Sequence, residues 1–132
     1  MDTAQAALID RFYEALSRRD FDGVLAMCDE GVRLYNAPGV EEMSLTPDGH
    51  ERVSAYLRGW LDSWETYDRK VEELRQAGDE EVVALVSIRA RGRGSTFDIE
   101  EDVADVFGVK DGRIVSLRLH VSRDEALPEA AQ

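Results

Sequence analysis

The spacing of apolar residues changes near residue 66, from a helical repeat to alternation. Before this point, apolar side chains recur at steps of three and four, the spacing of one face of an α-helix. After it, alternating segments follow one another with only short turns between them, and Asp111-Gly112 is the strongest hairpin signal. Consecutive antiparallel strands have one face to bury, and the preceding helices are the only cover available, so an α+β fold is expected. The strands are expected at residues 70–76, 81–93, 96–109 and 113–121.

The segment before residue 66 predicts three helices and one short strand. Asp20 and Asp48 are suited to cap the second and third helices, because a carboxylate accepts hydrogen bonds from the N–H groups of a first turn. Pro38 ends the strand, and residues 40–47 have no period and are expected to form a loop. In chain order, the elements are helices at residues 4–18 and 21–28, a strand at residues 32–36 and a helix from residue 48 to about residue 66.

The length of 132 residues is that of one domain, expected to span residues 1–132. A long twisted sheet that curls around helices leaves a cone, and a cone of this size holds one internal cavity. The expected architecture is a cone-shaped, curved antiparallel sheet wrapped by three N-terminal helices. The order of its elements is helix, helix, strand, helix and then four strands.

The formal net charge of −12 restricts the partners of the chain. Nucleic-acid backbones and anionic membrane surfaces carry dense negative charge, so neither is an expected partner. No apolar run approaches the roughly 18 residues of a membrane helix. The first eight residues lack the basic and apolar regions of a signal peptide. A cytoplasmic location is therefore expected.

The chain has few residues suited to disulfide or metal chemistry. Cys28 is the single cysteine, so no intramolecular disulfide can form, and its apolar surroundings favour a buried thiol over a nucleophile. His50 and His120 are far apart without a clustered cysteine or carboxylate pair, which argues against a metal site. His50 is expected to be solvated or to lie in a capping region, and His120 to lie at an interface. No glycine-rich phosphate loop occurs, and no cofactor is expected.

Three arginines and three carboxylates alternate on the predicted outer face of the sheet. The arginines lie in the long strand at residues 81–93, and the carboxylates lie in the strand that follows. Pairing through the Gly94-Ser95 turn sets the two rows opposite each other. Such a cross-strand ladder neutralises the arginines, and it is favoured over a phosphate-binding patch. The six residues are Arg89, Arg91, Arg93, Asp98, Glu100 and Asp102.

Asp105 lies between Val103 and Phe107 in a row predicted to point inward. A carboxylate in an apolar row is costly unless it is paired or used. Two structural explanations are open: the register is shifted by one residue, or Asp105 meets a hydrogen-bond donor that the sequence does not reveal. The functional explanation is a pocket carboxylate whose pKa is raised by desolvation, suited to act as a general acid, a base or a hydrogen-bond donor.

Three stretches carry a family pattern: Phe-Tyr-Glu-Ala-Leu and Arg-Asp-Phe-Asp at residues 12–22, Gly-His-Glu-Arg-Val at residues 49–53, and Val-Phe with Lys-Asp-Gly-Arg-Ile-Val at residues 106–115. In order and spacing they resemble the SnoaL-like branch of the nuclear transport factor 2-like superfamily. The resemblance covers nearly the whole chain and implies a curved sheet wrapped by three helices, usually a homodimer through the outer sheet face. The superfamily includes polyketide cyclases, ketosteroid isomerase, epoxide hydrolases, dehydratases and non-catalytic binding domains, so the fold alone does not settle the function.

The resemblance also assigns roles to individual residues. Tyr13 matches the oxyanion-hole tyrosine of ketosteroid isomerase, and Asp105 matches its protonated aspartic acid. The general base of that enzyme falls near Asn36, where residues 35–38 offer no carboxylate, so steroid-type isomerisation is not expected. Epoxide hydrolases match less well, because residues 117–119 read Leu-Arg-Leu where an acid is needed. SnoaL-like cyclases use an acid on the inner sheet face, and Asp105 is the candidate for that role.

The predicted function is an internal pocket for a small hydrophobic, carbonyl-bearing molecule. In one hypothesis the protein is an isomerase or cyclase that needs no cofactor. Asp105 is then the general acid/base, and Tyr13 and Asn36 hydrogen-bond the substrate oxygen. The alternative is a non-catalytic domain of the same fold that binds a small ligand or dimerises. The expected pocket walls are Tyr56, Trp60, Val103, Phe107, Leu34, Val86, Ile88 and Leu119.

Overall fold

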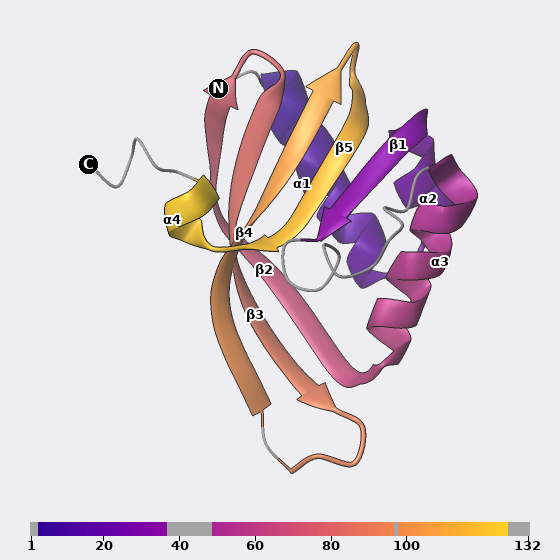
Figure 1. Ribbon diagram of the computed structural model, residues 1–132, viewed down its shortest axis with the longest axis vertical. Helices are drawn as coiled ribbons and strands as arrows, with labels where there is room; N and C mark the ends of the chain where they lie inside the picture. Colours follow the sequence, from indigo (N-terminus) through magenta and orange to yellow (C-terminus); the bar gives the residue numbers. More distant parts are fainter. Residues whose placement is uncertain (1–2, 37–48, 97, 127–132) are drawn as a thin grey trace.

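The computed structural model describes residues 3–36, 49–96 and 98–126 (Figure 1). It confirms the predicted α+β order of two helices, a strand, a third helix and four further strands. The helices are α1 (Thr3–Ser17), α2 (Phe21–Ala26), α3 (Gly49–Asp62) and the short α4 (Arg123–Ala126). The strands are β1 (Cys28–Asn36), β2 (Trp64–Gly78), β3 (Glu81–Gly92), β4 (Asp98–Lys110) and β5 (Arg113–Val121). The predicted loop at residues 40–47 and the cap at Asp48 lie outside the described residues.

The strands form one curved sheet in the order β1-β5-β4-β3-β2 (Figure 1). From β2 to β5, neighbours in the chain are antiparallel neighbours in the sheet, as the alternation predicted. β1 pairs in parallel with β5, so the sheet is mixed rather than purely antiparallel. Local periodicity could not reveal this pairing, because it joins the first strand of the chain to the last.

The boundary between α3 and β2 lies earlier than the pattern predicted, at Trp64 rather than near residue 66. The step of four from Trp60 to Trp64 suits a helix, but Trp64 begins the strand and packs back against Trp60 of α3. β2 therefore includes Tyr67 and Arg69, which the sequence left outside the strands.

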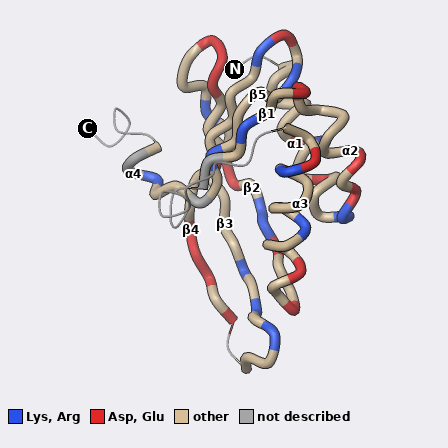
Figure 2. Tube along the Cα trace, turned by 45° about the vertical axis from the view of Figure 1, so that its right-hand side comes forward, with Lys and Arg blue, Asp and Glu red and all other residues tan. Residues whose placement is uncertain are grey.

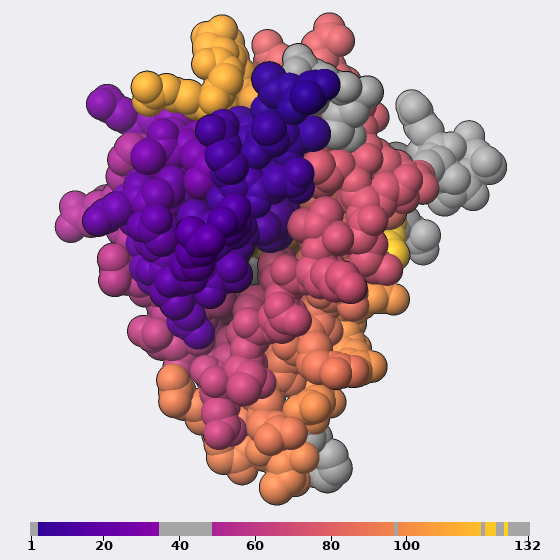
Figure 3. Space-filling model, turned by 180° about the vertical axis from the view of Figure 1, so that it is seen from behind, coloured from indigo at the N-terminus to yellow at the C-terminus, as the bar shows by residue number. Residues whose placement is uncertain are grey.

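The main core lies between the sheet and the helices α1, α2 and α3 (Figure 1). Seen from behind, α1 lies beside β2 on the surface (Figure 3). Both α1 and α3 bury one face and expose the other, as helices that cover a sheet do. Within the described ranges, no helix is both long and apolar enough to cross a membrane. The largest fully buried side chains are Phe12, Phe107, Ile9, Leu34, Leu57, Ile114 and Leu117.

A smaller apolar cluster lies on the opposite face of the sheet, where α4 packs against β4. Arg123 of α4 donates to the carbonyl oxygens of Val86 at 3.2 Å and Val103 at 3.3 Å. Its guanidinium also lies 2.6 Å from Glu72 of β2. These contacts fix α4 against three neighbouring strands, β2, β3 and β4. The cluster consists of Val83, Leu85, Ala104, Val106 and Val121, with Ala126 packed against it.

Two rungs of the predicted charge ladder form on the exposed arm of β3 and β4. Arg89 donates to Glu100 with two N–H groups, and Arg91 Nε lies 2.9 Å from Asp98 Oδ1. Figure 2 shows the basic and acidic residues along these two strands. Two of the three arginines, Arg89 and Arg91, are therefore neutralised across the strands as predicted.

The third predicted rung does not form. Asp102 lies opposite Ser87 in the strand register, and Arg93 lies beyond the last β3–β4 pair. Arg93 Nε donates instead to the carbonyl oxygen of Asp62 at 2.7 Å, which links the end of β3 to the end of α3.

Candidate functional site

The inner face of β4 carries a buried carboxylate, Asp105, between Val103 and Phe107. Its side chain is 0% exposed, and no other charged residue in the described part of the chain is classed as buried. β4 is irregular relative to β5 between Ala104 and Val106, which is the position of Asp105. The inward orientation predicted from the alternation is confirmed, because Asp105 is buried and pairs regularly with Ala84 of β3 despite the shift relative to β5.

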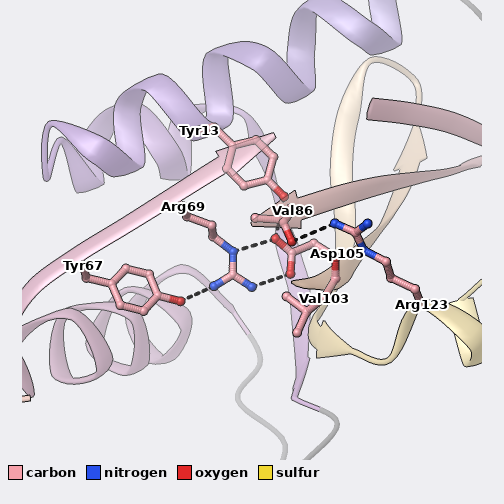
Figure 4. A network of polar contacts seen from close by, with 7 residues as sticks. All are labelled: Tyr13, Tyr67, Arg69, Val86, Val103, Asp105 and Arg123. Atoms are coloured by element: carbon pink, nitrogen blue, oxygen red, sulfur yellow. Dashed lines mark hydrogen bonds and ion pairs between the residues drawn. The ribbon is translucent and has the colours of Figure 1, made fainter. Parts of the chain in front are cut away.

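Tyr13 and Arg69 hold Asp105 with three hydrogen bonds (Figure 4). The Tyr13 hydroxyl donates to Oδ2 at 2.5 Å. Arg69 donates from Nε to Oδ2 at 2.8 Å and from Nη2 to Oδ1 at 2.5 Å. This bidentate contact matches a planar guanidinium to a planar carboxylate, which is a strong form of ion pair. Asp105 therefore meets the hydrogen-bond donors that one explanation of its position required.

Tyr13 reaches Asp105 from the buried face of α1. Its ring packs edge to face against Phe12 and Phe107, at centroid distances of 5.5 and 5.7 Å. Burial, together with the negative charge of Asp105, raises the pKa of Tyr13 well above its ordinary value. The phenol therefore stays protonated at neutral pH and acts as a donor.

Arg69 is the residue of this site that the sequence analysis missed. It lies on β2, and 7% of its side chain is exposed. Burial disfavours its charge, but attraction and hydrogen bonding to Asp105 outweigh that effect and raise the pKa of Arg69. The alternation along β2 is the pattern that could have revealed Arg69. Once the strand begins at Trp64, Tyr67, Arg69 and Val71 share its less exposed face.

Arg69 also donates from Nη1 to the phenol oxygen of Tyr67 (Figure 4). Burial raises the pKa of Tyr67, and the charge of Arg69 and a hydrogen bond with Trp60 partly oppose that rise. Because the phenol is protonated and its oxygen is the acceptor in this contact, its O–H remains able to donate. The result is a continuous polar chain from Tyr13 through Asp105 and Arg69 to Tyr67.

An aromatic cluster extends this chain towards the surface. The rings of Trp60, Trp64 and Tyr67 lie between 5.7 and 6.2 Å apart, centroid to centroid. They border a hollow of about 230 Å³, which we call the aromatic hollow. Ile99 at its edge is 41% exposed, the one large apolar side chain classed as exposed in the described ranges. The full lining is Trp60, Trp64, Tyr67, Ile88, Ala90, Ile99 and Glu101.

Trp64, which lines the aromatic hollow, has a buried indole N–H group. Trp64 Nε1 is inaccessible to water and has no hydrogen-bond acceptor among the described residues. A buried N–H group without an acceptor costs on the order of 1–3 kcal/mol.

Two other hollows border the described residues. One of about 30 Å³ lies where Tyr67 and Arg69 meet the ends of α1 and α3. The larger, about 260 Å³, lies between the start of α1 and the turns at residues 79–80 and 110–112. Size alone would favour the larger hollow, but none of the predicted site residues lines it. The aromatic hollow is the better candidate, because Tyr67 connects it to the buried polar chain.

The predicted pocket walls divide between the aromatic hollow and the packed core. Trp60 and Ile88 line the hollow. Phe107 packs against Phe12 and Tyr13 within the core. The other predicted walls also belong to the core, namely Leu34, Tyr56, Val86, Val103 and Leu119.

Asn36, the third residue predicted to be catalytic, ends β1, where its backbone lies opposite Leu119 of β5. Its side chain lies outside the described part of the structure, as does that of His120. The prediction that Asn36 hydrogen-bonds a substrate oxygen therefore stays a prediction.

The surroundings of Cys28 and His50 indicate structural roles and not catalytic ones. His50 Nε2 lies 3.1 Å from the carbonyl oxygen of Cys28, a contact that links α3 to β1. Burial raises the pKa of the Cys28 thiol to about 12, so the thiol is protonated at neutral pH and a poor nucleophile. Across the described ranges, no three His, Cys, Asp or Glu side chains group as a metal site would require.

The SnoaL-like domain family matches the chain over residues 9–117. No curated protein matches it. The match spans the elements from α1 into β5 and therefore includes Tyr13, Arg69, Asp105 and the aromatic cluster.

Several solved structures share the fold. A nuclear transport factor 2-like protein of unknown function from Burkholderia pseudomallei is 25% identical, with a TM-score of 0.79 over 96% of this chain and 97% of that chain. TerC, co-crystallized with polyporic acid, is 18% identical, with a TM-score of 0.77 over 96% and 97% of the two chains. A Mycobacterium tuberculosis protein in complex with estradiol-17beta-hemisuccinate is 16% identical, with a TM-score of 0.75 over 93% and 97%. These likenesses establish the fold.

Proposed function

This chain belongs to the SnoaL-like domain family, and we propose that it binds a small, largely apolar molecule with a carbonyl or similar oxygen acceptor in the aromatic hollow. The observation that carries the proposal is the position of Tyr67. Its ring lines the hollow, and its oxygen accepts from Arg69, so its O–H can donate to a ligand oxygen.

The polar chain behind Tyr67 supports this role. Asp105 holds the guanidinium of Arg69 in one orientation, and Arg69 in turn donates to Tyr67. Successive hydrogen bonds polarise one another, which makes the last donor of the chain stronger. A strengthened, preoriented phenol is suited to a carbonyl or enolate oxygen.

The size and lining of the aromatic hollow suggest the body of the ligand. A volume of about 230 Å³ is smaller than the roughly 300–1,000 Å³ of drug-sized sites, so one or two rings is the expected size. Aromatic and aliphatic side chains make up most of the wall. Two neighbours of the same fold were crystallised with small organic molecules, polyporic acid and estradiol-17beta-hemisuccinate, which fits a ligand-binding role.

Acid/base catalysis by Asp105 is the second candidate. The hydrogen bond of 2.5 Å from Tyr13 favours it, because these two residues occupy the positions that the family resemblance assigns to chemistry. Against it, both oxygens of Asp105 already accept hydrogen bonds, and proton transfer would require the pair with Arg69 to open. Binding is therefore the function that the geometry supports better.

A fluorescence titration tests the binding role. Trp60 and Trp64 are the only tryptophans of the chain, and both line the aromatic hollow, so intrinsic fluorescence reports on this site. The neutral ketone 4-tert-butylacetophenone is a suitable probe. Tyr67→Phe is expected to weaken its binding by about three- to tenfold, the loss of one hydrogen bond. Tyr56→Phe on α3, outside the hollow lining, is the matched control and should leave the affinity unchanged.

The same ketone separates binding from catalysis. If Asp105 transfers protons, the protein accelerates exchange of the methyl-ketone hydrogens in heavy water, followed by NMR, and Asp105→Asn abolishes the acceleration. Saturable binding without accelerated exchange supports the binding role alone. Absence of any fluorescence change at saturating ketone would contradict the proposed site.

A further inference from the structure

Glu101 gives the aromatic hollow an acidic edge. It lies on the inner face of β4, opposite Ile88 of β3, and it lines the hollow with the two tryptophans and Tyr67. Glu101 is exposed, whereas Tyr67 is mostly buried, so the carboxylate lies on the solvent side of the hollow.

Among the residues that the structure describes, the lining contains one carboxylate and no Lys, Arg or His side chain. Arg69, the arginine of the polar chain behind Tyr67, is paired with Asp105. Arg89 and Arg91 of the adjoining strand lie on the outer face, where Glu100 and Asp98 pair with them. With a net charge of −12 for the chain, the surroundings of the hollow favour a positive ligand.

We propose that the ligand of the aromatic hollow is cationic, with an ammonium group held by the rings of Trp60 and Trp64 and by the carboxylate of Glu101. Tryptophan and tyrosine rings attract cations through their quadrupoles, and tryptophan does so most strongly. A carboxylate at the edge of the hollow adds charge attraction. The inference rests on the proposed function, which places a small ligand in this hollow, and it specifies the charge of that ligand.

The closing experiment compares two probes of the same shape. The (4-acetylphenyl)trimethylammonium ion and 4-tert-butylacetophenone share the ring, the ketone and the bulky group, and they differ in a quaternary nitrogen replacing a carbon. Tryptophan fluorescence titration gives the dissociation constant of each. The cation is expected to bind about tenfold more tightly, from the cation–π and carboxylate contributions together.

Glu101→Gln tests the carboxylate. The variant is expected to weaken binding of the cation by about threefold and to leave binding of the neutral ketone unchanged. Glu100→Gln is the matched control, because Glu100 is the neighbouring residue on the outer face and should affect neither probe. Raising the salt concentration should reduce the preference for the cation in the unchanged protein.

Three results would overturn the inference in distinguishable ways. If the neutral ketone binds as tightly as the cation, the ligand is not cationic and the proposed binding function stands. If Glu101→Gln weakens both probes equally, the carboxylate acts on the shape of the hollow and not through charge. If neither probe changes the fluorescence, the proposed function fails together with the inference.

Discussion

Arg69–Asp105 and Arg89–Glu100 are the same kind of pair in two different surroundings. In each, an arginine donates two hydrogen bonds to a carboxylate of β4. The inner pair has side chains that are 7% and 0% exposed, whereas the outer pair has side chains that are 69% and 63% exposed. Among the described residues, only the inner pair is extended by neutral donors and acceptors, Tyr13 and Tyr67.

Water explains why these two pairs should behave differently. At the surface, solvent screens the attraction and hydrates either partner when the other is removed, so exposed pairs contribute little. In the interior, a charge that loses its partner has no such substitute. The inner pair therefore orients other groups and the outer pair neutralises an exposed arm, although the chemistry is shared.

The largest effect is expected from breaking the inner pair on one side. Arg69→Met leaves the Asp105 carboxylate buried without its counter-ion and should lower the free energy of unfolding by about 3–5 kcal/mol in urea denaturation. The double variant Arg69→Met, Asp105→Leu removes both charges and should recover most of that loss. If Arg69→Met is as stable as the unchanged protein, the Arg69–Asp105 pair is open to water in solution.

Removal of the neutral donor of the inner pair should have a smaller effect. Tyr13→Phe keeps the ring and its edge-to-face contacts but removes the hydrogen bond to a charged, buried acceptor. The expected loss is about 1.5–3 kcal/mol of unfolding free energy, measured by urea denaturation. Glu100→Gln, which changes a charge on the outer face, is the control. If Tyr13→Phe lowers the free energy of unfolding no more than Glu100→Gln does, the role of Tyr13 is contradicted.

Rising pH should lower the free energy of unfolding through buried groups before it affects the exposed charge ladder. Burial raises the pKa of Cys28 from its ordinary value of 9.0 to about 12 in the folded state, so between these values the unfolded chain releases a proton that the folded chain retains. Stability is then fully present below about pH 9 and falls as pH rises, by about 1 kcal/mol between pH 9 and pH 10. Thermal unfolding at several pH values measures this slope.

Cys28→Ala provides the comparison for the pH experiment, because it removes the thiol and leaves the buried tyrosines. Its stability should depend less steeply on pH than that of the unchanged protein above pH 9. Tyr13 and Tyr67, whose pKa values are also raised, should account for the dependence that remains at higher pH. Equal slopes in the two proteins would show that the thiol does not control this range.

The outer pair should show the smallest effect. A double-mutant cycle of Arg89→Gln and Glu100→Gln is expected to give a coupling free energy of about 0.2–1 kcal/mol. That coupling should decline as the salt concentration rises, because the pair is exposed. A coupling as large as that of the inner pair, or one insensitive to salt, would remove the distinction between the two regions.

Part of the candidate site was predictable from the alternation alone. The inward position of Asp105 followed from its apolar neighbours in β4, and the buried position of Tyr13 followed from the apolar face of α1. Arg69 was missed because the tryptophan spacing extended the predicted helix past the start of β2. Most of the predicted pocket walls are apolar residues that pack in the core. The prediction included them because a hydrophobic pattern does not distinguish a core residue from a pocket residue.

The sequence by itself determined the α+β class, the order of the elements, the antiparallel succession from β2 to β5 and the two faces of β4. These properties depend on periodicity and turn residues, which act between neighbours in the chain. The tertiary structure alone decided that β1 joins β5 in parallel and that Arg69 meets Asp105 across 36 positions of sequence. It also decided which aromatic rings border the hollow. Such contacts arise only when separate elements are packed together, and no local pattern encodes the partner of a buried charge.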